Sequence, residues 1–207
     1  MNEEYIEKDI LKNSFYMISL FTKSKKSYDG DVKEQNKLEK DENDNITEDS
    51  IEKYMKSNLC IITNLKLQKI MYFVEAYYMS KETTANELYD SEWSAWDYGP
   101  VNRKLYDYFK KYGSLELNLS EEEQQIAEQL PNINKKYINI IYKRFGCFNA
   151  FDLVSLTHMK NSPWEKIKKS KQYNFQVLNE SVIDKKTTCE WFEKEFGFLD
   201  KTEEDNQ

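Results

Sequence analysis

Glycine and proline are scarce in this sequence, with five and three among 207 residues. An architecture of many short strands needs turn residues at its corners, so this scarcity favours helices over a many-turned β fold. No apolar run approaches the ~20 residues that a membrane-spanning helix needs. The first ten residues, MNEEYIEKDI, are acidic where a secretory signal would be basic. We therefore expect a cytoplasmic protein that does not associate with membranes.

Cysteine and histidine are also rare. The three cysteines, Cys60, Cys147 and Cys189, form no CxxC pair, which indicates reduced thiols and not a disulfide or zinc framework. His158 is the only histidine, and it has no Ser or Cys partner at a recognisable spacing and no second His to share a metal. We expect it to be a structural histidine at a helix end, and we expect no catalytic residue, no metal and no cofactor. An enzyme acting through His158, with Thr157, is an alternative.

The net charge of −7 disfavours nucleic acid as a partner, because an acidic chain is repelled by phosphates. One segment, Val101–Tyr112, nevertheless combines basic residues with aromatic ones, as a phosphate-binding helix would. Asp107 interrupts this basic side, and the aromatic positions match a stripe that faces a core. In the nucleic-acid alternative alone, the phosphate contacts would be Arg103, Lys104, Lys110 and Lys111.

Aromatic residues are abundant, with 15 Tyr, 11 Phe and 4 Trp. Aromatic rings bury large areas, so these residues can form a core although small aliphatic ones are few. Apolar residues recur at helical spacing, most clearly in Leu65–Ser80, which Thr63 or Asn64 can cap. The sequence predicts a mainly α fold, a single compact helical domain of about seven helices. A small β hairpin or strand near residues 88–98 is the one expected β element.

Capping residues predict where several helices begin. Ser120 and Glu123 have the spacing of a capping box, in which each side chain binds the other residue's backbone N–H. Asn149 is placed to cap the helix that begins directly after it. Ser162 followed by Pro163 suits a helix start, because the missing proline N–H is not needed in the first turn.

The stretch WSAWDYGPVNRKLYDYFKKYG, residues 93–113, connects the β element to a helix. Gly99 allows the chain to turn sharply, and Pro100 suits the first turn of the helix that follows. Gly113 suits the C-terminal end of that helix. We expect Trp96 to anchor the strand in the core beside the helix at 65–80.

The chain divides by composition into four parts. Residues 1–23 contain an amphipathic helix of unknown role, expected over 5–21, and residues 24–49 form a charged segment with few aliphatics. Such a segment cannot bury enough apolar surface to offset its ordering entropy, so we expect a flexible linker. Residues 50–197 form the globular domain, and residues 198–207 an acidic, disordered tail. We expect that the domain folds without residues 1–45.

Three sequence blocks resemble a known family. They are ITNLKLQKIMYFVEAYYMS (Ile62–Ser80), EWSAWDYGPVNRKLYDYFKKYG (Glu92–Gly113) and LVSLTHMKNSPWEKIK (Leu153–Lys168). In order and separation they resemble the LKLQKLLYF helix, the AWxYGPV turn and the C-terminal TH…PW element of the phage-associated, SocA-like domain, also called the Panacea antitoxin domain. The resemblance covers about residues 50–197. Met71 followed by Tyr72 stands where Leu-Tyr is usual, which is a conservative departure.

This resemblance implies a small, mostly helical, non-enzymatic antitoxin, which binds and neutralises a cognate toxin protein. In at least one type of member it implies a proteolytic adaptor that hands the toxin to a Clp-type protease. The alternative is a DNA-binding regulator of a prophage or mobile element. We expect the partner-binding face to be formed by Tyr72, Trp96, Tyr98, Gly99, Pro100, His158 and Trp164.

Overall fold

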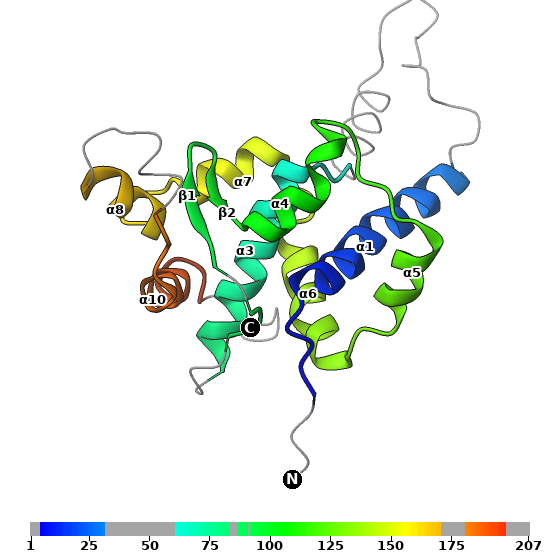
Figure 1. Cartoon of the computed structure of the whole chain (residues 1–207), viewed down its shortest axis with the longest axis horizontal. Helices are drawn as coiled ribbons and strands as arrows, with labels where there is room; N and C mark the ends of the chain where they lie inside the picture. The colour runs from blue at the N-terminus through cyan, green and yellow to red at the C-terminus, as the bar shows by residue number, and fades with distance from the viewer. Residues whose placement is uncertain (1–4, 32–60, 83–86, 91, 171–180, 198–207) are drawn as a thin grey trace, which may run out of the picture.

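The computed structural model describes residues 5–31, 61–82, 87–90, 92–170 and 181–197. These residues form eight α-helices, one short 3-10 helix and one two-stranded antiparallel sheet (Figure 1). The predicted mainly α fold with a small hairpin is therefore confirmed. Residues 32–49 of the expected linker and the acidic tail lie outside the described residues.

Helix α3 (Asn64–Lys81) lies at the centre of the fold, with 14 of its 18 residues buried. A helix that is buried on nearly every side must be surrounded by other elements. Helices α6 (Asn132–Phe145), α7 (Ala150–Thr157) and α10 (Lys185–Phe196) and the hairpin all pack against it. The predicted helix at 65–80 is confirmed, and the Thr63 side chain caps it by accepting from the backbone N–H of Lys66.

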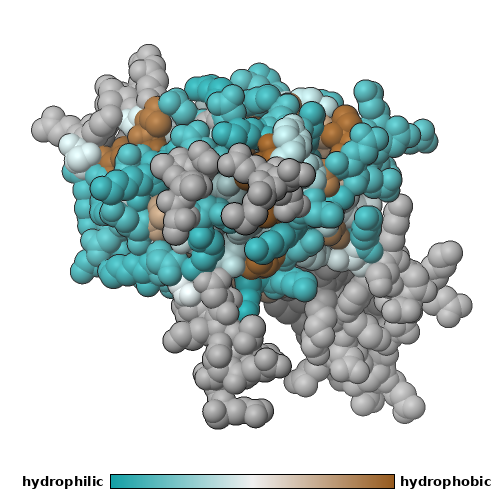
Figure 2. Space-filling model, turned by 90° about the horizontal axis from the view of Figure 1, so that it is seen from below, coloured by the Kyte–Doolittle hydropathy of each residue, from teal (hydrophilic) through white to brown (hydrophobic). Residues whose placement is uncertain are grey.

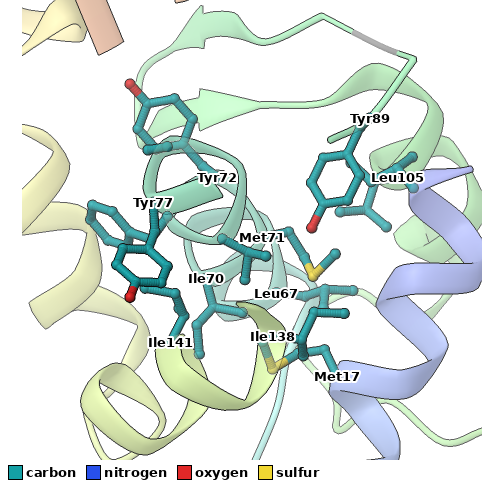
Figure 3. Packing of buried hydrophobic residues seen from close by; sticks show 14 of the residues in the cluster. Met17, Leu67, Ile70, Met71, Tyr72, Tyr77, Tyr89, Leu105, Ile138 and Ile141 are labelled. Carbon is teal, nitrogen blue, oxygen red and sulfur yellow. The ribbon is translucent and has the colours of Figure 1, made fainter. Parts of the chain in front are cut away.

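The core around α3 takes side chains from both ends of the chain. Figure 3 shows Leu67, Ile70 and Met71 of α3 facing Ile138 and Ile141 of α6. Aromatic rings fill the other side of α3, where Phe73 stacks on Phe145 at 5.0 Å and meets Phe192 and Phe196 of α10. The aromatic residues thus supply much of the core, as their abundance predicts.

Helix α1 (Ile10–Asp31) belongs to this core. Its buried side chains, Ile10, Phe15, Met17, Ile18 and Phe21, are at most 5% exposed. Its neighbours are α5 (Glu121–Glu128) and α6 (Figure 1). The helix begins later than expected and continues through residues 24–31, which the sequence assigned to a linker. This packing argues against the expectation that the domain folds without residues 1–45.

The predicted helix starts agree with the structure. Ser120 and Glu123 form the reciprocal capping box of α5. Asn149 caps α7 by accepting from two backbone N–H groups. Ser162 accepts from the backbone N–H of Glu165 at the start of α8 (Pro163–Ser170).

The hairpin consists of β1 (Ser94–Trp96) and β2 (Gly99–Val101), paired with Trp96 opposite Gly99. Backbone hydrogen bonds to residues 181–183 extend its β1 edge. Pro100 lies in β2 and does not start a helix, which corrects the sequence expectation. Asn102 instead caps α4 (Arg103–Phe109), which continues into the 3-10 helix η1 (Lys110–Tyr112) and ends at Gly113, with φ of 56°.

Figure 2 shows one face on which hydrophilic residues dominate and hydrophobic residues form small separate patches. Within the described part of the chain, no helix has both the length and the apolar character needed to cross a bilayer.

The packing of α1 predicts that a cavity in this helix destabilises the whole domain. Ile18 is fully buried, so Ile18→Ala should lower the free energy of unfolding by about 2–5 kcal/mol. Lys12→Ala on the same helix is the control, because Lys12 forms only a surface ion pair with Glu7 and should cost less than about 1 kcal/mol. Urea denaturation followed by circular dichroism measures both. If Ile18→Ala unfolds like the wild type, α1 is not part of the cooperative core.

Candidate partner-binding corner

Gly99 brings the hairpin into direct contact with α3 and α7. Its φ of 92° is a backbone conformation that residues with a side chain rarely adopt. A Cβ at this position would overlap the Oγ1 of Thr157 and lie 3.2 Å from the Cε of Lys69. Gly99 is therefore required both by its backbone conformation and by the close approach of two other elements.

Two polar side chains of α3 hold the backbone of this hairpin. The buried Lys69 amine donates to the Pro100 carbonyl at 2.7 Å. Gln68 accepts from the backbone N–H of Asn102 at 2.9 Å. Burial lowers the pKa of Lys69 well below its ordinary value, because no charged partner offsets the loss of water. These contacts fix the position of β2 relative to the central helix.

The THMKNSPW segment, residues 157–164, holds the other strand. The indole N–H of Trp164 donates to the Trp96 carbonyl at 2.6 Å. His158 stacks on Trp164, with ring centroids 3.5 Å apart and planes inclined by 10°. The His158 pKa falls to about 4, mainly through desolvation, with smaller effects from the charges of Lys69 and Lys168. His158 is therefore neutral at pH 7, and its ring supports the tryptophan that binds the hairpin.

Thr157 is poorly placed to act as a nucleophile. Thr157 is 1% exposed, and its hydroxyl donates to the Val154 carbonyl at 2.8 Å, so it is not presented as a nucleophile. Among the described residues, no cluster of three or more His, Cys, Asp or Glu side chains could hold a metal ion.

Exposed aromatic side chains cover the outside of the same corner. Tyr98, at the hairpin turn, is 60% exposed, and Phe151, on α7, is 65% exposed. Their ring centroids lie 6.4 Å apart in an edge-to-face arrangement. Trp96 is half-buried, and its ring lies 4.8 Å from that of Tyr106 on α4. We call the surface formed by Trp96, Tyr98, Tyr106 and Phe151 the aromatic surface.

An open pocket lies within the aromatic surface. Its volume is about 360 Å³, and it is lined by the hairpin turn, the first turns of α3, and α4. Trp96, Asp97 and Tyr98 supply the hairpin side, and Tyr106 supplies the α4 side. The pocket is thus a surface feature whose walls come from segments far apart in the sequence.

The structure brings six of the seven predicted site residues together at this corner. The exception is Tyr72, which is 2% exposed, shares a hydrogen bond with Thr188 and packs edge-to-face on Trp93. Trp93 and not Trp96 is the tryptophan buried beside α3, and its indole N–H donates to the buried carboxyl of Glu75. The expected role of Trp96 as a core anchor is therefore corrected. Its ring lies at the edge of the pocket.

The basic side chains of α4 and η1 form ion pairs or contact aromatic rings within the domain. Lys104 pairs with Asp9 at 3.0 Å, and Lys110 pairs with Asp107 at 2.9 Å. The Arg103 guanidinium lies 4.8 Å from the centroid of the Trp96 ring. Lys111 lies over the rings of its neighbours Tyr108 and Tyr112. These side chains do not form one cationic stripe.

Three residues of the corner were missed from the sequence: Lys69, Tyr106 and Phe151. Lys69 interrupts an otherwise apolar helical stripe. A lysine at a position that the pattern predicts to be buried indicates a buried polar contact. Tyr106 and Phe151 have the spacing of core residues, and only the tertiary structure shows that they lie on the surface.

The fold and the corner around the hairpin together define a class of protein. It is a helical domain that presents a rigid hairpin with exposed aromatic side chains. Residues 67–165 match the family described as Antitoxin SocA-like, Panacea domain. This match confirms the resemblance seen in the three blocks. The family supports an antitoxin role in general. No significant match was found among the curated proteins or the solved structures.

The low His158 pKa predicts a pH dependence of stability. The unfolded chain binds a proton at this histidine below about pH 6.5, whereas the folded chain resists protonation until about pH 4. The contribution of neutral His158 to the free energy of unfolding is thus fully present above pH 6.5, and it is lost as the pH falls toward 4. We expect the stability difference between wild type and His158→Gln to shrink over this range, measured by urea denaturation. A difference that stays constant would contradict the assignment.

Glu75 provides the matched control, because its shift has the opposite sign. Burial raises its pKa to about 7, although Lys185 and the Trp93 N–H favour its charged form. The contribution of protonated Glu75 to the free energy of unfolding is full below pH 4.5, and it is lost as the pH rises through 7. Glu75→Gln should therefore change the pH profile in the direction opposite to His158→Gln.

Proposed function

We propose that this protein neutralises a cognate toxin by binding it directly through the aromatic surface. The observation that supports this most is the exposed Tyr98–Phe151 pair, held on a hairpin whose backbone is fixed by buried side chains. Exposed aromatic residues on a fixed backbone are typical of binding hot spots, since little conformational entropy is lost when they become buried. The family match supports an antitoxin role for the domain.

Neutralisation in this proposal is occlusion of the toxin and involves no bond chemistry. The corner presents rings and backbone, while its histidine and threonine serve packing. We place this binding in the cytoplasm. Delivery of the bound toxin to a Clp-type protease, which the resemblance implies for some members, is an extension that would need a second surface for the protease.

A DNA-binding regulator has less support. Lys104 and Lys110, two of its four candidate phosphate contacts, are paired with aspartates of the domain, and Arg103 is stacked on Trp96. Phosphate binding depends on cations that replace condensed counterions, and binding here would first break these pairs.

Neutralisation should depend on the exposed rings. Co-expression of the toxin encoded by the neighbouring gene with Tyr98→Ala/Phe151→Ala should stop growth, whereas the wild type restores it. Loss of one hot-spot ring costs about 2 kcal/mol, roughly 30-fold in affinity. Tyr5→Ala is the matched control, since Tyr5 is 68% exposed but lies on the segment before α1.

Circular dichroism and thermal melting show whether the double variant keeps its fold. A folded double variant that still rescues growth would place the toxin contact elsewhere. A neighbouring gene product that is harmless alone, or that stays lethal beside the wild-type protein, would contradict the antitoxin proposal itself.

A further inference from the structure

We propose that the pocket in the aromatic surface binds an arginine side chain of the partner protein. This inference rests on the proposed function, because it names the chemistry of the partner at the same surface. The pocket volume of about 360 Å³ lies at the lower end of the range for ligand sites, which suits one side chain better than a larger molecule. Three observations select a cation as the occupant.

The first observation is a carboxylate in the lining of the pocket. Asp97 is the only charged residue in the pocket lining that the structure describes. It is exposed, and it forms no ion pair or hydrogen bond with any other described residue. Aspartates elsewhere on this surface, such as Asp9 and Asp107, have lysine partners. Asp97 is therefore available to a cation from another molecule.

The second observation is the set of rings around this carboxylate. Trp96, Tyr98 and Tyr106 all line the pocket. The faces of aromatic rings attract cations, and the planar guanidinium group stacks on them while its N–H groups bind a carboxylate. Arg103 shows the same chemistry within the chain, with its guanidinium carbon 4.8 Å from the Trp96 ring centroid. A second guanidinium would find Asp97 and the tyrosine rings on the pocket side.

The third observation is the charge of the whole chain. A net charge of −7 attracts a basic partner at long range and repels acidic ones. A second copy of this chain and a nucleic acid are both disfavoured by this charge. A basic segment of a protein satisfies the rings, the carboxylate and the net charge together.

The test uses a short peptide, acetyl-Gly-Arg-Gly-amide, as the probe. The matched control peptide carries citrulline, which keeps the shape of arginine without its charge. The full-length protein is labelled with ¹⁵N, and the indole N–H signal of Trp96, assigned with Trp96→Phe, is followed by NMR during titration. We expect a saturable shift with the arginine peptide and none with the citrulline peptide.

Two protein variants make the assignment specific. Asp97→Asn should weaken peptide binding about fivefold or more, as expected for loss of the charge partner of a stacked cation. Asp107→Asn should bind as the wild type, because Asp107 pairs with Lys110 and does not line the pocket. Equal shifts with both peptides, or unchanged affinity in Asp97→Asn, would overturn the proposal.

The peptide result is separable from the neutralisation result. Neutralisation that requires Tyr98 and Phe151, together with a peptide that does not bind, would refute the arginine pocket and leave the antitoxin proposal standing. A peptide that binds in an Asp97-dependent manner supports the pocket even if the neighbouring toxin is not neutralised. Asp97→Asn that binds no peptide and also loses rescue, with Asp107→Asn normal in both assays, supports both proposals.

Discussion

The hydrogen bond from the buried Lys69 amine to the Pro100 carbonyl is the contact on which the functional corner depends. Burying an amine is costly, and the low pKa of Lys69 expresses that cost. Lys66, one turn earlier on α3, is also buried and donates to the Gly146 carbonyl at 2.8 Å. The two lysines of the LKLQK sequence thus connect the central helix to the hairpin on one side and to the end of α6 on the other.

This arrangement explains why the three sequence blocks occur together. The LKLQK block supplies donors to the hairpin backbone, and the YGP sequence supplies a glycine that allows α3 and α7 to approach it. The block that contains THMKNSPW supplies a tryptophan that binds the other strand, supported by the histidine ring. Because each block holds the same hairpin, Tyr98 and its neighbours are presented in a fixed arrangement. A preformed surface loses less entropy on binding, which favours recognition by contact alone.

Local features of the fold were predictable from the sequence, whereas burial was not. Capping at Ser120, Asn149 and Ser162 follows from short-range hydrogen bonding and agrees with the structure. The continuation of α1 past Phe21 was missed, because lysine forms helices as readily as many apolar residues, so a loss of apolar spacing does not mark a helix end. Trp93 and Trp96 have nearly the same local context, so only the tertiary structure shows which is buried.

The sequence predicted most residues of the candidate site, but it did not predict the buried hydrogen bond that holds them in place. Gly99, Pro100, His158 and Trp164 meet at the corner as expected, although Pro100 does so from a strand. Tyr72 was assigned to the surface because its helical position allowed either environment, and it lies in the core. Lys69 was overlooked because a lysine is usually solvated, and its burial depends on a carbonyl contributed 31 residues later.

The central claim is that α3 holds the hairpin through Lys69, and native-state amide hydrogen exchange in Lys69→Met tests it most directly. This substitution keeps an unbranched side chain, one atom shorter than lysine, and removes the donor to Pro100. The account predicts that the amide of Asn102, which donates to Gln68, exchanges about tenfold faster while that of Ile138 in α6 keeps its rate. Equal changes at both amides, or none at Asn102, would contradict the account.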